Sequence, residues 1–241
     1  MTGRADDPWH HRGVGGRRRL IQWDVDRTLL VGGGVALEAF AAAFTAVTGV
    51  AWAGTLSAAG RTDLSVAPEL FAQHGIADAD PFLARFFARY TVEFTARAHL
   101  VPHRGHVLPG VPAVLRALHG RVVQTLVTGN IQAVGVQKVT AFGLDPFLDT
   151  DVGGYGDDHA VRSELVLRSR RRAEAVHGPF SEVLVVGDTV HDVGAALAAG
   201  VTAVGVATGP ASAAELTAAG AHHVLDDLAD VAAAVAVLAG T

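Results

Sequence analysis

The chain has 241 residues, of which half are apolar and 18% are charged, and its formal net charge is -5. These values are typical of a compact globular protein and exclude a disordered chain. The acidic balance argues against a nucleic-acid groove and against an anionic membrane surface as partner. Because the chain has no cysteine, disulfides, thiol catalysis and cysteine metal sites are excluded, which fits a cytoplasmic location.

The first 19 residues differ in composition from the rest of the chain. They contain five arginines, two aspartates and four glycines with almost nothing apolar, so we predict a flexible tail over 1–19. The most membrane-like window is 35–59. It carries Glu38 and internal glycines, and its large apolar residues fall on one helical face. This pattern predicts a soluble helix and no membrane span.

The remaining pattern alternates between strands and helices, except in one long stretch. Residues 35–103 show helical spacing without a convincing strand. Short apolar strands are expected at 20–23, 122–127, 183–186, 202–206 and 224–225. The alternation predicts an α/β fold with a Rossmann-like parallel sheet. We expect one α/β core domain formed by 20–33 and 106–241, interrupted by an all-helical domain at 34–105.

Two carboxylates follow the first strand with one residue between them. Asp24 and Asp26 point the same way along an extended chain, so they repel each other unless a cation or a proton is nearby. Mg²⁺ is the simplest candidate, because it takes oxygen ligands from one or two carboxylates and from a substrate phosphate. One carboxylate could then attack phosphorus while the other handles a proton. The alternative is a strand end with ordinary solvated acids.

Other polar residues follow the ends of later strands. Thr128 lies after the second strand, and Asp188 and Asp192 lie after the third. Ligands of open parallel sheets bind beyond the carboxyl ends of the strands, so these residues are expected to converge with Asp24 and Asp26 in one crevice. The alternative is that the two later aspartates are helix-start acids and that Thr128 is a helix cap.

Three ordered motifs resemble those of the haloacid dehalogenase (HAD) superfamily, in its phosphoglycolate phosphatase-like branch with a helical cap. They are DVDRT at 24–28, LVTGN at 126–130 and GDTVHD at 187–192. The resemblance covers about 20–238 and implies that the helical insert is the cap domain. It also implies a phosphatase that acts on a small phosphorylated metabolite.

The resemblance assigns roles to individual residues. Asp24 would be the nucleophile that forms an aspartyl-phosphate. Asp26 would protonate the leaving alcohol and then activate water. Thr128 would bind a phosphoryl oxygen, assisted by the backbone N–H groups of Gly129 and Asn130.

The resemblance also implies a set of metal ligands. Mg²⁺ would be held by Asp24, by the backbone carbonyl of Asp26 and by Asp188, with Asp192 supporting the site through water or indirect contacts.

The sequence departs from the family pattern at two places. Arg27 stands where glycine is usual, which places a long cation beside the metal site or pointing away from it. The usual third-motif lysine is displaced, because the chain's only lysine, Lys138, comes too early. Arg162, just before the expected helix 163–176, is the favoured replacement, since it supplies the same charge; Lys138 and His159 are the other candidates.

Two features of the helical insert bear on the substrate. Arg61, in a polar loop at 60–63, could present its charge to an anionic ligand. An aromatic stripe at Phe82, Phe86, Phe87, Tyr90 and Phe94 is expected to form the core of the insert, with a substrate-contacting wall as the alternative. The helix that carries this stripe is expected to begin with Asp80 as its cap.

Other functions stay open at this stage. A 2-haloacid dehalogenase or a phosphomutase could use the same fold, and a non-catalytic phosphometabolite-binding protein is a further alternative. The histidines show no helical pair typical of zinc sites and are expected at the surface or in packing.

Overall fold

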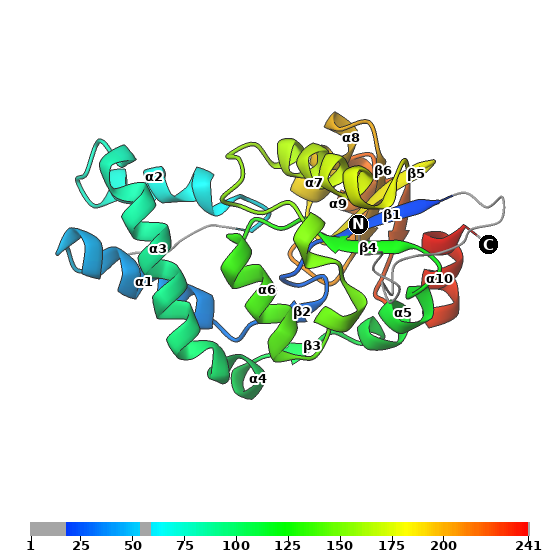
Figure 1. Ribbon diagram of the computed structural model, residues 1–241, viewed down its shortest axis with the longest axis horizontal. Helices are drawn as coiled ribbons and strands as arrows, with labels where there is room; N and C mark the ends of the chain where they lie inside the picture. Colours follow the sequence, from blue (N-terminus) through cyan, green and yellow to red (C-terminus); the bar gives the residue numbers. More distant parts are fainter. Residues whose placement is uncertain (1–17, 54–58, 241) are drawn as a thin grey trace, which may run out of the picture.

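A five-stranded parallel sheet forms the centre of the computed structural model, which describes residues 18–53 and 59–240 (Figure 1). Its spatial order is β4-β1-β5-β6-β7. The strands are β1 (Arg19–Trp23), β4 (Val123–Leu126), β5 (Glu182–Gly187), β6 (Thr202–Val206) and β7 (His223–Leu225). The expected α/β fold with a parallel sheet is confirmed. Most of the predicted tail lies outside the described residues.

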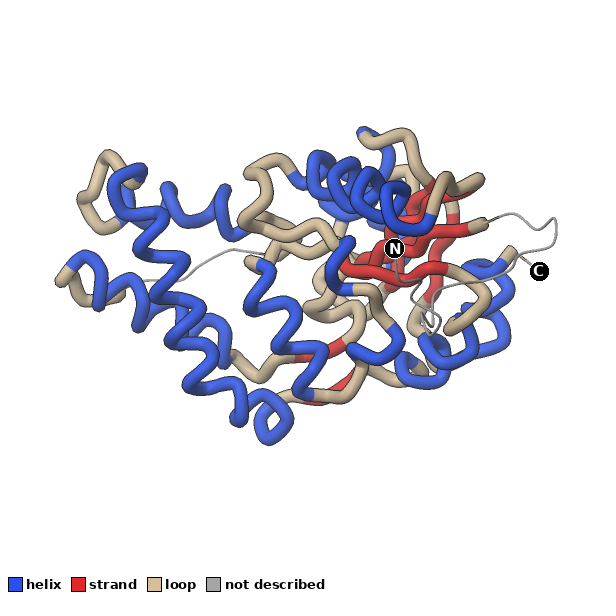
Figure 2. The backbone as a smooth tube through the Cα atoms, viewed as in Figure 1, coloured by secondary structure: helices blue, strands red, loops and turns tan. Residues whose placement is uncertain are grey.

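Helices cover both faces of the sheet (Figures 1 and 2). One face packs against α7 (Arg162–His177), α8 (Val190–Ala198) and α9 (Ala213–Ala218), and the other against α5 (Val111–Leu118) and α10 (Val231–Ala239). Side chains alternate accordingly along β1: Ile21 and Trp23 join the core under α5 and α10, whereas Leu20 joins the core under α7 and α8. The sheet is therefore buried on both sides, as parallel sheets require.

A group of helices lies beyond the carboxyl ends of the strands, at the left of Figure 1, with α6 (Gln132–Ala141) between it and the sheet. It comprises α1 (Val35–Thr48), α2 (Asp63–Gln73), α3 (Asp80–Arg97), the 3₁₀ turn η1 (Ala98–Leu100) and α4 (Val101–Arg104). Phe86, Tyr90 and Phe94 of the aromatic stripe are buried in its core together with Phe40 and Phe44. The stripe is thus core, as expected, although Tyr90 also lines a cavity described below.

The predicted boundaries at 33/34 and 105/106 fall beside a pair of short strands that the sequence did not reveal. The strand β2 (Leu30–Val31) pairs antiparallel with β3 (His106–Val107) and closes the two ends of the insert against each other. Two residues are too few to show a strand period. Two 3₁₀ turns, η2 (Asp145–Phe147) and η3 (Thr150–Val152), complete the described elements.

The start of α3 differs in detail from the expectation. Its N-cap is Ala79, and Asp80 is already helical with Pro81 beside it in the first turn. The Asp80 N–H donates to the Asp78 carboxylate at 3.1 Å, so an earlier aspartate satisfies this end of the helix. Asp80 can still interact favourably with the helix dipole from the first turn.

None of the helices in the described part of the chain is both long enough and apolar enough to cross a membrane.

Candidate active site

A cavity of about 350 Å³ lies at the carboxyl ends of β4, β1 and β5 and reaches the helices of the insert. The Asp24 N–H donates to the Val186 carbonyl at 2.9 Å, which fixes Asp24 directly after β1 and beside β5. The residues predicted to converge all line this cavity except Asp192, which is buried beside it: Asp24, Asp26, Thr128, Gly129, Asn130, Arg162 and Asp188. Strand order thus brings together side chains that are far apart in the sequence.

Three buried carboxylates form a group that could hold a metal ion. One ligand oxygen each from Asp24, Asp188 and Asp192 lies within 4.8 Å of the others. Burial and, after it, the nearby charge of Asp192 raise the pKa of Asp188 to about 7. Burial also raises the pKa of Asp24 well above its usual value, against the lowering effect of Arg162. Three hard oxygen donors with excess negative charge fit a divalent cation such as Mg²⁺.

Two threonines orient these acids. Thr28 donates its hydroxyl to Asp188 Oδ1 at 3.2 Å. Thr189 caps α8 and donates its N–H and its hydroxyl to Asp192 Oδ2, at 3.0 and 2.6 Å. Asp192 is therefore both a capping-box acid of α8 and a member of the carboxylate group, whereas Thr128 does not cap α6, whose N-cap is Ile131.

Arg162 lies between two of the three acids. It is the first residue of α7, and one terminal guanidinium nitrogen donates to Asp24 Oδ1 at 2.7 Å and to Asp192 Oδ1 at 2.6 Å. The two acids, acting against burial, raise the pKa of Arg162 further. Arg162 therefore contacts the expected nucleophile, Asp24, directly.

Lys138 also reaches the site, but at the other aspartate. Its ammonium lies 2.8 and 2.6 Å from the two carboxylate oxygens of Asp26 and 2.8 Å from Asn130 Oδ1. Asn130 in turn donates to Asp26 Oδ2 at 2.7 Å and to Thr128 Oγ1 at 2.9 Å. Lys138 and Arg162 were alternatives for the third-motif cation in the sequence. In the structure Lys138 contacts Asp26 and Arg162 contacts Asp24. The third candidate, His159, accepts from the Val161 N–H at 3.0 Å.

Burial and basic neighbours act in opposite directions on Asp26. Partial removal from water raises the pKa of its carboxyl, but Lys138 and Asn130 lower it by more, so the pKa lies below its usual value. The side chain of Asp26 is 43% exposed, whereas that of Lys138 is 3% exposed. Asp26 is therefore a carboxylate that opens on the cavity and rests on a buried cation.

The two remaining arginines of the cavity wall differ in their contacts. Arg61 pairs with Glu69 at 2.8 Å and donates to the Ser65 carbonyl at 3.3 Å, so its guanidinium is already engaged. Arg27 is exposed and lines the cavity, with no ion pair to any described residue. Its φ of 62° lies in the left-handed region, which explains physically why glycine suits this position.

Asp63 is a cavity residue that the sequence reasoning missed. Its Oδ2 accepts from the Ile131 N–H at 2.9 Å, and its own N–H donates to the Gly129 carbonyl at 2.8 Å. Burial raises its pKa to about 7. Asp63 follows the N-cap Thr62 and starts α2, where the sequence indicated only a polar loop at 60–63.

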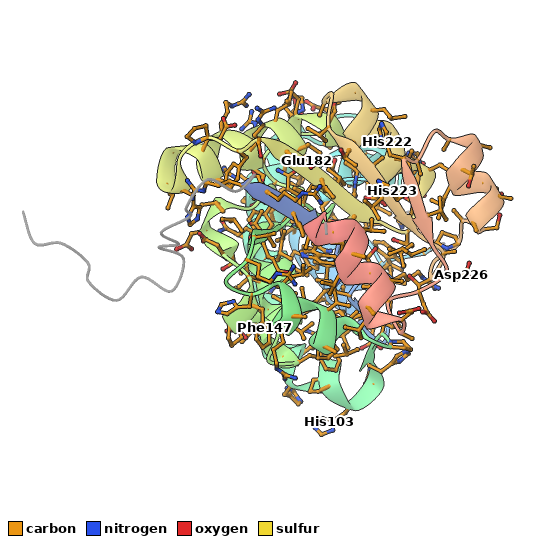
Figure 3. The ribbon with its side chains drawn as sticks, turned by 90° about the vertical axis from the view of Figure 1, so that its right-hand side faces the viewer. His103, Phe147, Glu182, His222, His223 and Asp226 are labelled. Atoms are coloured by element: carbon orange, nitrogen blue, oxygen red, sulfur yellow. The ribbon has the colours of Figure 1, made fainter. Side chains whose placement is uncertain are left out.

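The histidines considered for zinc do not gather at this site. His103, His222 and His223 lie on the surface, with His103 far from the other two in the view of Figure 3. Within the described residues, the carboxylate group above is the one cluster of potential metal ligands, and it contains no histidine.

The fold and the site together define an α/β protein with an acid-lined active-site cavity at the carboxyl ends of its parallel strands. The family model for haloacid dehalogenase-like hydrolases matches residues 21–197, and a model described as HAD-hydrolase-like matches 164–231. The chain belongs to the haloacid dehalogenase-like hydrolase family and is therefore a hydrolase. No match was found among curated proteins.

Solved structures of similar fold cover nearly the whole chain. A predicted phosphatase from Clostridium acetobutylicum is 19% identical, with a TM-score of 0.67 over 92% of this chain and 99% of that one. A predicted phosphoglycolate phosphatase from Haemophilus somnus is 18% identical, with a TM-score of 0.62 over 91% and 99%. A hydrolase from Pseudomonas syringae is 23% identical, with a TM-score of 0.62 over 90% and 97%. At these identities the likeness establishes the fold.

Proposed function

We propose that the protein is a Mg²⁺-dependent phosphatase that hydrolyses a small phosphomonoester through an aspartyl-phosphate on Asp24. The observation that carries this proposal is the grouping of Asp24 with Asp188 and Asp192 at a cavity that Asp26 also enters. The printed names of two structural neighbours, both predicted phosphatases, agree with it.

Asp24 is the proposed nucleophile. Its Oδ1 is held by Arg162 at 2.7 Å, and its Oδ2 has no hydrogen-bond partner among the described residues. Oδ2 would attack phosphorus, and the bond between phosphorus and the ester oxygen would break. Asp26, once it has taken up a proton from the cavity solvent, would give that proton to the departing alkoxide. Asp26, now anionic, would take a proton from water, whose oxygen attacks the aspartyl-phosphate and releases inorganic phosphate and free Asp24.

The remaining polar groups would bind the phosphoryl oxygens. Thr128 Oγ1 and the N–H groups of Gly129 and Asn130 would serve as donors, because phosphoryl transfer depends on positioning and on stabilising charge spread over those oxygens. Mg²⁺ would be held by Asp24, the backbone carbonyl of Asp26 and Asp188, with Asp192 acting through water. When bound, the ion would supply positive charge against the phosphoryl oxygens.

Asp192 fits an indirect role at the metal. Both of its carboxylate oxygens already accept hydrogen bonds, one from Arg162 and the other from Thr189. Such bonds orient a carboxylate and limit its freedom to bind an ion directly.

A 2-haloacid dehalogenase is supported less well by these contacts. That reaction needs the nucleophile but neither a metal nor a proton donor for the leaving halide. The clamp on Asp26 by Lys138 and Asn130, and the acids beyond Asp24, would then have no task.

The proposal is tested by phosphate release from an aryl phosphate in the presence of Mg²⁺. We expect Asp24→Asn to lose about 10³-fold or more of the activity, since the nucleophile is removed. Asp226→Asn, at an exposed position near β7, is the matched control and should keep full activity (Figure 3). Equal activity of Asp24→Asn and the unaltered protein would rule out the assigned nucleophile, and halide release from a haloacid without Mg²⁺ would favour the dehalogenase.

A further inference from the structure

One member of the aromatic stripe on α3 differs chemically from its neighbours and lines the active-site cavity. Phenylalanine occupies four of the five stripe positions, and tyrosine occupies position 90. Tyr90 is 2% exposed and belongs to the wall of the cavity, whereas Phe86 and Phe94 are fully buried in the helical core. The stripe thus carries its one hydroxyl where α3 meets the cavity.

The ring of Tyr90 is held firmly in place. Its centroid lies 5.0 Å from that of Phe40 in an edge-on arrangement and 6.3 Å from that of Phe86 in a stacked one. Such contacts fix the ring plane and therefore the position of its hydroxyl. No described residue forms a hydrogen bond with that hydroxyl. A tyrosine hydroxyl can both donate and accept a hydrogen bond, so at the cavity wall it is available to a ligand.

Asp63 supplies a second unsatisfied group on the same wall. Its Oδ2 is used by the Ile131 N–H, and its Oδ1 has no hydrogen-bond partner among the described residues. Burial raises the pKa of Tyr90 well above its usual value, and the carboxylates of Asp63 and Asp26 raise it further, which reflects the proximity of these groups. The wall of one cavity therefore offers a hydroxyl from α3 and a carboxyl oxygen from the start of α2.

The chemistry of this wall selects among phosphomonoesters. Lys138 and Arg162 already contact Asp26, Asp24 and Asp192, and Arg61 contacts Glu69. A leaving group that carried a carboxylate would meet the like charge of Asp63, and among the cavity cations only the exposed Arg27 makes no ion pair with a described residue. A neutral hydroxyl can instead donate to Asp63 and accept from Tyr90.

We propose that Tyr90 and Asp63 form a subsite for a hydroxyl group on the leaving alcohol, so that the preferred substrates are phosphomonoesters of small polyhydroxylated alcohols. This inference rests on the proposed phosphatase function and specifies the substrate class of the same site. It assigns Tyr90 and Asp63 to substrate selection and leaves the phosphoryl chemistry to Asp24 and Asp26.

The test compares glycerol phosphate with propyl phosphate, which has the same carbon chain and lacks the two free hydroxyls. We expect kcat/KM to be about 10-fold or more higher for glycerol phosphate, since two hydrogen bonds are gained. Tyr90→Phe should lower kcat/KM about 3- to 10-fold for glycerol phosphate and change it less than about 2-fold for propyl phosphate. Asp63→Asn should also reduce the preference for glycerol phosphate over propyl phosphate, because the carboxylate acceptor is lost. The amide oxygen of the new side chain can still accept the bond from the Ile131 N–H, so the local structure is kept.

Tyr155→Phe is the matched control for loss of a buried hydroxyl. Tyr155 donates to the Thr150 carbonyl at 2.6 Å and does not line the cavity. This variant should leave the ratio of the two kcat/KM values unchanged. The inference is overturned if Tyr90→Phe affects both esters equally, if it affects neither, or if phosphoglycolate is turned over better than glycerol phosphate.

A different result would refute the proposed phosphatase function itself: the unaltered protein would release phosphate from no ester, including phenyl phosphate. In that case calorimetric binding of glycerol phosphate still decides the subsite. Binding that is equally tight with and without Tyr90→Phe would refute it.

Discussion

Lys138 Nζ lies 2.6 Å from Asp26 Oδ2 and 2.8 Å from Asp26 Oδ1, so the chain's only lysine clamps the carboxylate proposed as acid and base. The lysine is buried and also bonded to Asn130, whereas the carboxylate opens on the cavity. Such an ion pair fixes the position of the Asp26 carboxylate and sets the pH range over which that carboxylate is charged.

The first prediction concerns the acidic limb of the pH–rate profile. Lys138 contributes to lowering the pKa of Asp26, so Lys138→Met should raise that pKa. Because water activation needs the anionic form of Asp26, the fall in kcat on acidification should begin at a higher pH in Lys138→Met. Gln137→Met, one residue earlier on the same helix, should leave the profile in place. An unshifted acidic limb in Lys138→Met would show that the clamp does not tune Asp26.

The second prediction concerns Arg162 as an internal counter-cation. Arg162→Met removes the guanidinium from two buried carboxylates, which should lower the free energy of unfolding by about 3–5 kcal/mol in the absence of metal. Added Mg²⁺ should restore more stability to this variant than to the unaltered protein, because more negative charge is left unneutralised. Chemical denaturation with and without Mg²⁺ measures both effects.

Arg170→Met provides the control for Arg162, since Arg170 makes a partly exposed pair with Glu174 on the same helix. Its loss should change the free energy of unfolding by no more than about 0.5 kcal/mol. If Mg²⁺ stabilises Arg162→Met no more than the unaltered protein, the arginine and the ion do not share these acids.

The third prediction is a pH dependence of stability that Asp63 causes. Burial raises its pKa to about 7 in the folded state, above the unfolded value, so the folded protein binds the extra proton between those two values. The resulting stabilisation is complete below the unfolded pKa and is lost as the pH rises through about 7. Asp63→Asn should therefore reduce the loss of stability between pH ~5 and ~8 by about 1–2 kcal/mol. Metal-free denaturation curves that keep the same pH slope in both proteins would contradict the assignment.

The fourth prediction concerns backbone strain at Arg27. Its φ of 62° is costly for a residue with a Cβ, and the conformation is held by bonds to Leu30 and Thr208. Arg27→Gly should raise the free energy of unfolding by about 0.5–1 kcal/mol, whereas Arg27→Ala should not, since alanine keeps the Cβ. If the two variants are equally stable, any change in the free energy of unfolding comes from the loss of the arginine charge and not from the backbone conformation.

The sequence predicted the fold and the convergence of the site because both depend on local patterns and on simple sheet geometry. The apolar strand before Asp24 and the strand before Asp188 were readable as such, and they are neighbours in the sheet. Parallel strands present their carboxyl ends at one edge, so their order alone brings the two acids together.

The contacts of single long side chains could not be predicted in this way. The position of Lys138 on α6 showed that it was helical, but not that this helix packs against α3 of the insert and turns its ammonium toward Asp26. The place of Asp63 in the cavity could not be predicted for a similar reason. A helix-start acid and a cavity acid look alike until tertiary packing places the helix end against Gly129 and Ile131.

The central claim is that Asp24 accepts a phosphoryl group, and chemical trapping of that intermediate tests it most directly. The protein would be mixed with an aryl phosphate and Mg²⁺, quenched in acid within one turnover and digested, and the peptide containing Asp24 analysed by mass spectrometry. The account predicts a phosphorylated Asp24, absent in Asp24→Asn. Phosphate release at an undiminished rate by Asp24→Asn, with no phosphoryl group on this peptide in the unaltered protein, would contradict it.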